Sequence, residues 1–263
     1  MPRTILPENG FSFGSPLGFH YICFLNEFAM KKKIVVFTGA GVSADSGIAT
    51  FRDADGLWAN YRIEDVCTPE ALVHNRDTVI DFYNARRREV LEKAPNAGHR
   101  AIAGLEKHFA VEVVTQNIDD LHERAGSTRV IHLHGEIVKL RSSADLELVF
   151  PLEGWEQPKD LRASDGALAR PHVVFFGEAV PMFEPAARIV STADVLIIAG
   201  TSLAVYPAAS LINYARRDAD IYVVDPHIPA SVGTGVRKIP MRGAEGLPML
   251  AGELIDKYIG CGL

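Results

Sequence analysis

Amide and carboxylate side chains follow the predicted strand 111–115 at its carboxyl end. They are Gln116, Asn117 and Asp119. Because amides hydrogen-bond well to other amides, this group would suit a ligand that carries a carboxamide, such as nicotinamide. The alternative is that these residues only cap a turn, where Asn and Asp are common.

Two histidines, His132 and His134, lie at the end of the next predicted strand, 130–133. Since they alternate, one can face a cleft while the other faces away. A histidine in a cleft titrates near neutral pH and can act as a general base, although a lone histidine is more often structural. No third ligand stands near the pair, so it does not predict a metal site.

Two turns rich in small residues also follow apolar strands. The first is Gly39-Ala-Gly-Val-Ser, after strand 34–37, and the second is Gly200-Thr-Ser, after strand 195–199. Glycine lets a backbone approach a phosphate closely, and the amides at a helix N-terminus can bind it. The spacing is not GxGxxG, so a plain dinucleotide fingerprint is excluded, and either turn alone could be only a tight turn.

A carboxylate, Asp225, ends the predicted strand 221–224. At such a position it can accept hydrogen bonds from both hydroxyls of an adenosine ribose. The alternative is a turn cap, because Pro226 follows it. Two turns that could hold phosphate and one acid that could bind ribose together favour a dinucleotide more strongly than either turn does alone.

The elements that must position these groups alternate between strand and helix. The pattern predicts strands at 34–37, 111–115, 130–133, 173–176, 195–199 and 221–225, and helices at 79–91 and 101–109. Continuous apolar strands separated by helices indicate an α/β fold, a Rossmann-like doubly wound parallel sheet with ligands beyond the carboxyl ends of its strands. The stretch 141–170 has no clear period and predicts an irregular surface insert.

The composition is that of a globular protein, with 48% hydrophobic and 23% charged residues among 263. There are 27 basic and 33 acidic residues, a formal charge of −6, which argues against nucleic acid or an anionic membrane as partner. The three cysteines are far apart, which suits a reducing cytoplasm and not a disulfide framework. The sequence contains no run of about 18 apolar residues, so it does not predict a membrane span.

The first 29 residues look unlike the rest and show no sustained period. Met30 is followed at once by a lysine run and the first strand. Our hypothesis is that Met30 is the biological start and that the leader is an artefact of gene prediction.

Six motifs, in order from about Lys33 to Leu250, together resemble the sirtuins, which are NAD-dependent protein-lysine deacylases. They are Gly39-Ala-Gly-Val-Ser, Phe51-Arg, Thr115-Gln-Asn-Ile-Asp, His134-Gly, Val174-Phe-Phe-Gly-Glu and Gly200-Thr-Ser. Each motif alone is weak, but six at suitable spacing are specific. The resemblance implies a catalytic domain over 31–263 after an N-terminal extension, 1–30. Its large Rossmann-like part would comprise 31–56, 94–135 and 171–263, and its small, partly helical part 57–93 and 136–170.

The resemblance also implies roles for single residues. The catalytic residues would be His134, Asn117 and Asp119. NAD would be bound by Gly39, Ala40, Gly41, Ser43, Phe51, Arg52, Gln116, Asn117, Ile118, Asp119, Gly200, Thr201, Ser202, Asp225 and Ala244. The substrate would be bound by Ala54, Tyr83, Arg86, Val174, Phe176, Gly177, Glu178, Leu203 and Val205, with the peptide adding as a strand between 176–178 and 203–205.

The reaction that the resemblance implies begins with loss of nicotinamide from NAD. The acyl oxygen of the lysine captures the ribose carbon, and His134 removes a proton from a ribose hydroxyl. The products are nicotinamide, free lysine and O-acyl-ADP-ribose.

Tyr83 and Arg86 are three residues apart on a predicted helix and therefore share one face. In the desuccinylase and demalonylase branch of the sirtuins, a Tyr-x-x-Arg pair binds the acyl carboxylate, since a guanidinium forks onto a carboxylate and a phenol adds a hydrogen bond. Ala54 would leave room for a bulkier acyl group. The alternative is a solvated basic helix face, because Arg87 and Arg88 follow.

The chain departs from the resemblance in three respects. Asp225 stands where many sirtuins carry an Asn on the adenosine ribose, and Ala49 stands at a position that is often proline. The third departure concerns a metal. Sirtuins usually hold a structural zinc with four cysteines after the His-Gly motif, and residues 134–170 contain none. We therefore expect neither zinc nor another metal, and an insert held by packing of Val149, Phe150, Leu152 and Trp155.

The leading hypothesis is a cytoplasmic, monomeric NAD-dependent lysine deacylase that prefers acidic acyl groups and also removes acetyl. Its partners would be acylated-lysine proteins or peptides, not nucleic acid or membrane. An ADP-ribosyltransferase or NAD hydrolase on the same scaffold is the alternative. A non-catalytic dinucleotide-binding regulator would not need His134, and a dehydrogenase would need the missing GxGxxG.

Overall fold

The computed structural model describes residues 31–49, 61–203, 206–229 and 232–260. Within these ranges the chain from Lys32 onward forms one compact unit. The predicted residues Phe51, Arg52, Ala54 and Val205 lie outside the described part.

A six-stranded parallel sheet forms the centre of this unit, as predicted. Its strand order is β3-β2-β1-β7-β8-β9. The strands are β1 (Lys33–Thr38), β2 (Ala110–Thr115), β3 (Val130–His132), β7 (Val195–Ala199), β8 (Asp220–Val224) and β9 (Val236–Ile239). The chain runs outward from β1 to β3 and then returns to β7 on the other side of β1, so the carboxyl ends of β1 and β7 flank a topological switch point, where ligands bind in such sheets.

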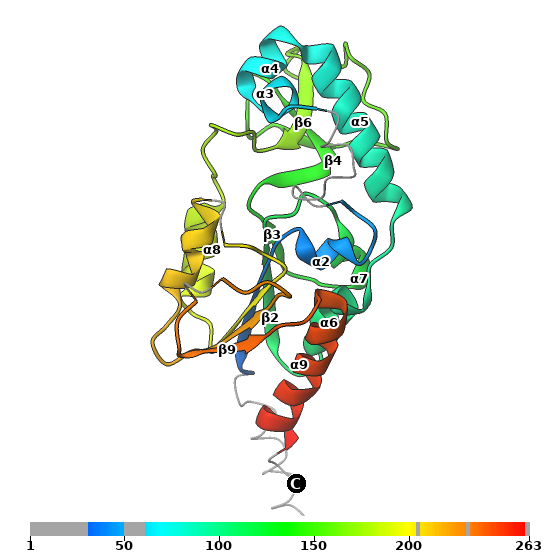
Figure 1. Ribbon diagram of the computed structural model, residues 1–263. Helices are drawn as coiled ribbons and strands as arrows, with labels where there is room; N and C mark the ends of the chain where they lie inside the picture. Colours follow the sequence, from blue (N-terminus) through cyan, green and yellow to red (C-terminus); the bar gives the residue numbers. More distant parts are fainter. Residues whose placement is uncertain (1–30, 50–60, 204–205, 230–231, 261–263) are drawn as a thin grey trace, which may run out of the picture. The chain divides into compact units, whose positions relative to one another are not determined.

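Helices cover both faces of the sheet, because alternate side chains of each central strand point to opposite sides. Ile34 and Val36 of β1 pack in one core with α6 (Ala97–Leu105) and α9 (Gly243–Tyr258). Val35 and Phe37 pack in a second core with α8 (Phe183–Val190) and the 3₁₀ helix η2 (Ala208–Tyr214). Figure 1 shows α6 and α9 beside one another, with α8 on the other side of the sheet.

A second, antiparallel sheet has the order β5-β4-β6. Its strands are β4 (Gly135–Ser142), β5 (Val149–Pro151) and β6 (Ala169–Val173). A third core joins this sheet to the helices α3 (Ile63–Val66), α4 (Pro69–His74) and α5 (Arg76–Glu92), drawn near it in Figure 1. This grouping supports the proposed division into a large and a small part, which stays a prediction.

The prediction of a strand at 173–176 was wrong in both place and sheet. The strand there is β6, which ends at Val173 and pairs with β4 in the small antiparallel sheet. Phe175 is nevertheless 2% exposed, because it packs in the third core as a loop residue. An apolar run thus indicated burial but not the element that causes it.

The predicted helices both begin earlier than expected. The helix predicted at 79–91 is α5, which starts at Arg76, and the one at 101–109 is α6, which covers Ala97–Leu105. Asn96 caps α6 through its side chain, which accepts from the amides of Gly98 and His99. No range had been predicted for the other elements, which are α2 (Gly41–Ala44), α3, α4, α7 (Leu121–Ala125), β4, β5, α8, η2, β9 and α9.

The insert 141–170 is irregular apart from β5 and the ends of β4 and β6, but packing of the expected residues does not hold it. Trp155 is 38% exposed, and Val149, Phe150 and Leu152 are only half-buried. Buried polar side chains of α5 hold it instead. Arg87, which is fully buried, donates from Nε to the carbonyl of Ile137 at 2.6 Å and from Nη1 to the carbonyl of Trp155 at 2.8 Å.

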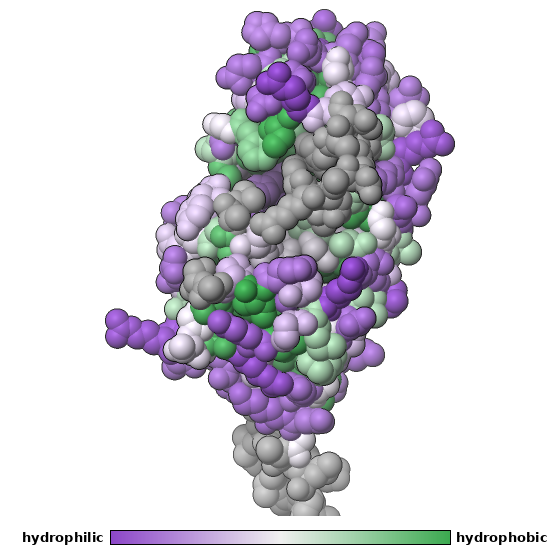
Figure 2. Space-filling model, in the orientation of Figure 1, coloured by the Kyte–Doolittle hydropathy of each residue, from purple (hydrophilic) through white to green (hydrophobic). Residues whose placement is uncertain are grey.

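Helix α5 is therefore an anchor for the insert on one face and a polar surface on another. Asn84 Nδ2 donates to the carbonyl of Gln157 at 3.0 Å, and the amide of Gln157 donates back to Asn84 Oδ1 at 2.8 Å. In the view of Figure 2, hydrophilic residues cover most of the surface over α3, α4 and α5. None of the helices in the described ranges is long and apolar enough to cross a membrane.

Candidate active site

The turns that follow β1 and β7 are bonded to each other through their backbones. The amide of Gly39 donates to the carbonyl of Ala199 at 3.1 Å, and that of Gly41 donates to the carbonyl of Gly200 at 2.8 Å. A Cβ on Gly41 would lie 2.8 Å from the Cα of Gly200, and Gly200 itself has a φ of +60°. The glycines are thus required for the contact between the two turns.

The expectation that the amides of the first turn are free for phosphate is wrong at four residues. Besides Gly39 and Gly41, the amides of Val42 and Ser43 donate to the carbonyls of Gly39 and Ala40. Helix α2 is only four residues long, so little of a helix N-terminus remains. The turn can shape a ligand site, but these four amides already have acceptors.

Asn117, Ser43 and Asp119 form one hydrogen-bonded chain. Asn117 Nδ2 donates to Ser43 Oγ at 3.0 Å, and that hydroxyl donates to Asp119 Oδ2 at 3.0 Å. The amide of Leu121 donates to Asp119 Oδ1 at 3.2 Å. All three chain members are buried, with 7%, 1% and 4% of their surfaces exposed. The structure therefore joins the turns after β1 and β2, as the sequence predicted.

Burial raises the pKa of Asp119, although the bonds from Leu121 and Ser43 work in the opposite direction. A buried carboxylate is costly unless donors satisfy it. Asp119 therefore depends on the Ser43 hydroxyl, which also fixes the orientation of the Asn117 amide. Ile118, which lies between Asn117 and Asp119 in the sequence, is half-buried against the third core.

His134 and Gln116 link the ends of β2, β3 and β7. His134 Nδ1 lies 3.0 Å from the carbonyl oxygen of Gln116, and Gln116 Nε2 donates to Thr201 Oγ1 at 2.9 Å. A carbonyl can only accept, so Nδ1 must carry the proton, and Nε2 of the neutral ring carries the lone pair. Burial lowers the pKa of His134, although the bond to Gln116 raises it. The ring is therefore neutral at pH 7 and able to accept a proton.

His132 is a structural histidine, so the two alternating histidines do differ as expected. Its Nδ1 contacts the carbonyl oxygen of Asn117 at 2.8 Å, and its Nε2 contacts Glu123 Oε1 at 2.8 Å. Burial alone would lower the pKa of His132, but the bond and charge of Glu123 outweigh it and the pKa is raised. Both ring nitrogens are used within the protein, which leaves His134 as the candidate base.

Two further buried histidines belong to the site and were not predicted. His99 Nε2 lies 3.4 Å from Ser43 Oγ, and His122 Nε2 lies 3.0 Å from Thr38 Oγ1. Their rings make an edge contact with centroids 4.8 Å apart. His99 completes a capping box with Asn96, three residues before it, and this spacing is the sequence signal that could have found it.

Tyr83 and Arg86 both act on the thiol of Cys67. The Tyr83 hydroxyl lies 3.4 Å from Cys67 Sγ, and the charge of Arg86 acts on the same thiol, whose pKa burial raises to about 11. Burial also raises the pKa of Tyr83 well above its usual value. Arg86 is 7% exposed, so the alternative of a solvated basic face is wrong for this residue. Arg88, whose side chain is 62% exposed, does lie on such a face.

The predicted substrate edge follows β6 and is braced by an ion-pair cluster. Glu178 accepts from Arg170 at 2.6 Å and from Arg141 at 3.2 Å, and its Oε2 also accepts from the amide of Phe175 at 2.7 Å. The neighbouring Phe176 is 46% exposed, and its amide donates to the carbonyl of Cys67 at 2.9 Å.

Other predicted residues of this edge are placed by their backbones. The amide of Val174 donates to the carbonyl of His134 at 2.9 Å, so the edge starts beside the candidate base. Gly177 has a φ of +89°. Leu203, across the predicted peptide site, has a φ of +53°, which is unusual for a residue other than glycine. Ser202 before it is half-buried.

Asp225 and Ala244 belong to two further segments, the turn after β8 and the start of α9. Asp225 Oδ1 accepts from the amide of His227 at 2.7 Å. This bond is the turn cap that the sequence analysis gave as the alternative to a ribose-binding role. The amide of Ala244 lies 3.4 Å from Asp45 Oδ2, next to α2. Asp225 follows β8, the second strand from β1 in the sheet.

The donors and acceptors at this edge of the sheet fit the nicotinamide and ribose parts of NAD. The amides of Asn117 and Gln116, the carboxylate of Asp119 and the hydroxyl of Thr201 suit a carboxamide and sugar hydroxyls. In the described ranges, no group of three or more His, Cys, Asp or Glu side chains could hold a metal ion.

Comparison with known proteins gives a consistent result. The sequence model described as "Sir2 family" matches residues 39–207. An "NAD-dependent protein deacylase" of Aggregatibacter actinomycetemcomitans is 54% identical over 198 residues, 75% of this chain and 95% of the relative. A protein of the same description from Bacteroides thetaiotaomicron is 49% identical over 230 residues, 83% of this chain and 97% of the relative.

Solved structures agree with the sequence relatives. A complex of a Sir2 homologue with NAD superposes with a TM-score of 0.78 at 38% identity, covering 90% of this chain and 94% of that one. A Sir2 protein bound to a deacetylated p53 peptide and 3′-O-acetyl-ADP-ribose superposes with a TM-score of 0.71 at 30% identity, covering 91% and 98%.

Proposed function

Because the chain belongs to the Sir2 family, we propose that it removes acyl groups from lysine side chains of proteins with NAD as cosubstrate. The observation that carries this proposal is the bond from His134 Nδ1 to the carbonyl of Gln116, which leaves Nε2 as a proton acceptor at the ends of β2 and β7. The products are nicotinamide, the free lysine and an O-acyl-ADP-ribose.

NAD, when bound, supplies a sugar carbon that takes up the acyl oxygen once nicotinamide leaves. We assign the carboxamide to Asn117, Ile118 and Asp119, and the sugar and phosphates to the small residues and hydroxyls of the turns after β1 and β7. Phe51 and Arg52 would complete that site from outside the described residues, with Asp225 and Ala244 at the adenosine end. Support comes from the bonded chain that fixes Asn117 and from the contact between the two turns.

His134 acts as the general base. Its buried, neutral ring takes a proton from a hydroxyl of the bound sugar through Nε2, while the Gln116 carbonyl holds the tautomer. The side chain of Gln116 also donates to Thr201, so the residue that holds the His134 ring connects the turn after β2 to the turn after β7. Binding alone would need no such base, which favours an enzyme over a regulator.

The peptide substrate adds as an extended strand beside the edge at Val174, Phe176, Gly177 and Glu178, opposite Leu203 and Val205. Main-chain bonds dominate this mode of binding, so recognition of the surrounding protein sequence is loose. Exposure of Phe176 and the brace that Glu178 forms with two arginines support a fixed, accessible edge. The partners are acylated-lysine proteins, and we expect the enzyme to act as a monomer in the cytoplasm.

The acyl group that fits best is an acidic one, such as succinyl or malonyl, with acetyl as a poorer substrate. The Tyr83 hydroxyl contacts the Cys67 thiol and the charge of Arg86 acts on it, while the Cys67 carbonyl accepts from the amide of Phe176 at the substrate edge. A largely buried guanidinium beside a phenol suits a carboxylate. Ala54 would leave the room that the longer chain needs.

Turnover of matched acetyl-, succinyl- and malonyl-lysine peptides tests this preference. Arg86→Met should lower kcat/KM for the succinyl peptide by about a hundredfold, the size expected from loss of a charge-assisted bond, and for the acetyl peptide by less than about fivefold. Arg88→Met, on the exposed face of the same helix, is the matched control and should change neither. Equal losses for both peptides in Arg86→Met would remove the assignment.

A further inference from the structure

Glu89 is the immediate ionic partner of the arginine to which we assign the acyl carboxylate. Arg86 Nη1 donates to Glu89 Oε2 at 2.8 Å, and Arg86 Nη2 donates to the carbonyl of Ala49 at 2.8 Å. The two side chains are 8% and 24% exposed. Without an acidic acyl group, the guanidinium is therefore already held by a carboxylate and a carbonyl from two separate segments.

We propose that Glu89 sets the acyl preference of this enzyme by competing with the carboxylate of an acidic acyl group for Arg86. This inference rests on the function proposed above, and it adds a specificity-determining residue to it. Glu89 itself does not contact the acyl group. It limits how strongly succinyl and malonyl are favoured over acetyl.

The charges at the pair give the physical reason. A guanidinium has five N–H groups, and the bonds to Glu89 and Ala49 use two of them. An acyl carboxylate can therefore still bind Arg86, but it binds an ion pair that is neutral overall and meets the negative charge of Glu89 nearby. An acetyl group carries no charge and meets no such penalty. Because the pair is mostly buried, water screens this repulsion only in part.

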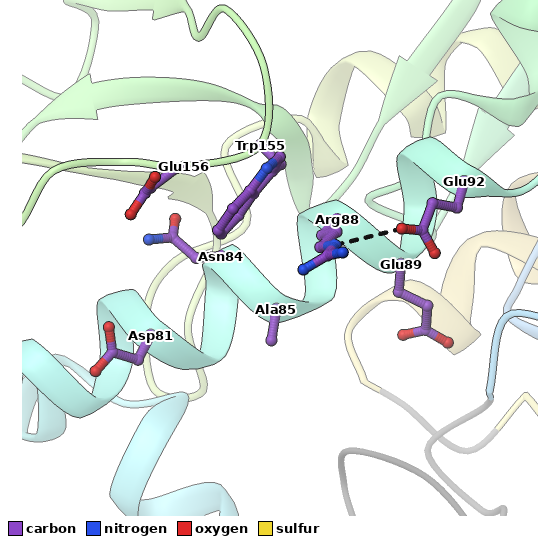
Figure 3. Close-up of a pocket in the computed structure, with 8 residues that line it drawn as sticks. All are labelled: Asp81, Asn84, Ala85, Arg88, Glu89, Glu92, Trp155 and Glu156. Carbon is purple, nitrogen blue, oxygen red and sulfur yellow. Dashed lines mark hydrogen bonds and ion pairs between the residues drawn. The ribbon is translucent and has the colours of Figure 1, made fainter.

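The other arginines of α5 are bonded elsewhere and do not relieve this competition. Arg87 binds the carbonyls of Ile137 and Trp155, and Arg88 pairs with Glu92 at 3.3 Å. Figure 3 shows the Arg88–Glu92 pair, and Glu89 beside it pointing away from Trp155. Arg88, Glu89, Glu92 and Trp155 are among the residues that line a shallow cavity of about 420 Å³ along α5, and Glu89 also bonds to Arg86.

Glu89→Gln tests the proposal, because glutamine keeps the acceptor for Arg86 and removes the charge. Glu92→Gln is the matched control, since it makes the same change in another Arg–Glu pair of α5. We expect Glu89→Gln to raise kcat/KM for a succinyl-lysine peptide about five- to tenfold, through a lower KM at unchanged kcat, as one partly screened charge interaction would. Activity on the acetyl peptide and the Tm should stay close to wild type, and Glu92→Gln should leave both activities within about twofold.

The outcomes separate this inference from the function on which it rests. If the wild type removes succinyl and Glu89→Gln leaves the succinyl-to-acetyl ratio unchanged or lower, only the role of Glu89 is wrong. Loss of both activities in Glu89→Gln would make it a structural residue and would also overturn the inference. If the wild type does not remove succinyl but Glu89→Gln does, the inference holds and the proposed acyl preference fails. If neither protein removes it, both fail.

Discussion

The hydroxyl of Ser43 donates a hydrogen bond to Oδ2 of Asp119 at 3.0 Å, across the gap between the turns that follow β1 and β2. The same hydroxyl accepts from Asn117. One small side chain thus satisfies a buried carboxylate and orients the amide next to it. This relationship explains why a serine, and not only glycine, is needed in the first turn.

Ser43→Ala should lower kcat by about ten- to a hundredfold and destabilise the fold by about 1 to 3 kcal/mol, since it removes the hydrogen bonds that Asp119 Oδ2 and Asn117 Nδ2 make with the Ser43 hydroxyl. Enzyme assays and urea denaturation measure both effects. Ser46→Ala is the control. Ser46 lies in the same segment as Ser43, but its hydroxyl accepts from Asn96 and is not part of the hydrogen-bonded chain of Asn117, Ser43 and Asp119. A Ser43→Ala enzyme with normal turnover would show that the chain does not position Asn117.

The pH dependence of kcat/KM should report the state of His134. Its pKa is lowered mainly by burial, so the base form persists below the ordinary value of 6.5 and activity is lost only as the pH falls through the lower, folded-state pKa. An acetyl-lysine peptide is the suitable substrate, because its acyl group does not titrate. A midpoint of the acid limb at or above pH 6.5 would contradict this environment for His134.

The folded protein should become less stable as the pH falls, because of His99. Burial lowers the pKa of His99 from 6.5 to about 4, so the unfolded chain binds more protons and the free energy of unfolding decreases as the pH falls below 6.5. For this group alone the loss between pH 7 and pH 5 is about 2 kcal/mol. His122, whose pKa burial also lowers, acts in the same direction, whereas His132, with a raised pKa, acts in the opposite one.

Urea denaturation at several pH values measures this effect. The loss between pH 7 and pH 5 should be smaller in His99→Gln than in the wild type by about 2 kcal/mol. An identical slope in the two proteins would mean that His99 is charged in the folded state or is not buried.

Ion pairs and buried polar side chains should replace a structural zinc in holding the substrate edge and the insert. Glu178→Ala should destabilise the protein by about 2 to 4 kcal/mol, because it leaves Arg141 and Arg170 without their carboxylate. Asp218→Asn, which breaks the exposed pair with Arg216, should cost less than about 1 kcal/mol. Treatment with a strong chelator should leave the Tm unchanged, whereas a clear fall would point to a bound metal.

The sequence predicted those parts of the fold and site whose signals are local. Strand β1 contains a continuous, largely β-branched apolar run and is followed by a turn rich in glycine, so both its burial and the position of its turn could be inferred. The alternation of His132 and His134 likewise predicted that only one would face the site. The proton on Nδ1 of His134, by contrast, depends on the carbonyl of Gln116, from another strand, and no spacing reveals it.

The parts that could not be predicted depend on long-range polar contacts. Arg87 looked like one of three surface arginines, yet it is fully buried because the carbonyls of Ile137 and Trp155 converge on it. Two of the amides expected to be free in the first turn, those of Gly39 and Gly41, donate instead to the carbonyls of Ala199 and Gly200, which lie far away in sequence. Periodicity reports which side of an element is apolar, but it does not report which carbonyls meet a given donor.

The most direct test of the account is to identify the products that the enzyme makes from NAD and a succinyl-lysine peptide, by mass spectrometry. We predict equal amounts of nicotinamide, free-lysine peptide and O-succinyl-ADP-ribose. In His134→Ala, formation of the last two should fall at least about a thousandfold while NAD affinity stays within a few-fold. Consumption of NAD without acyl transfer, transfer of ADP-ribose to the peptide, or near-normal turnover by His134→Ala would contradict the account.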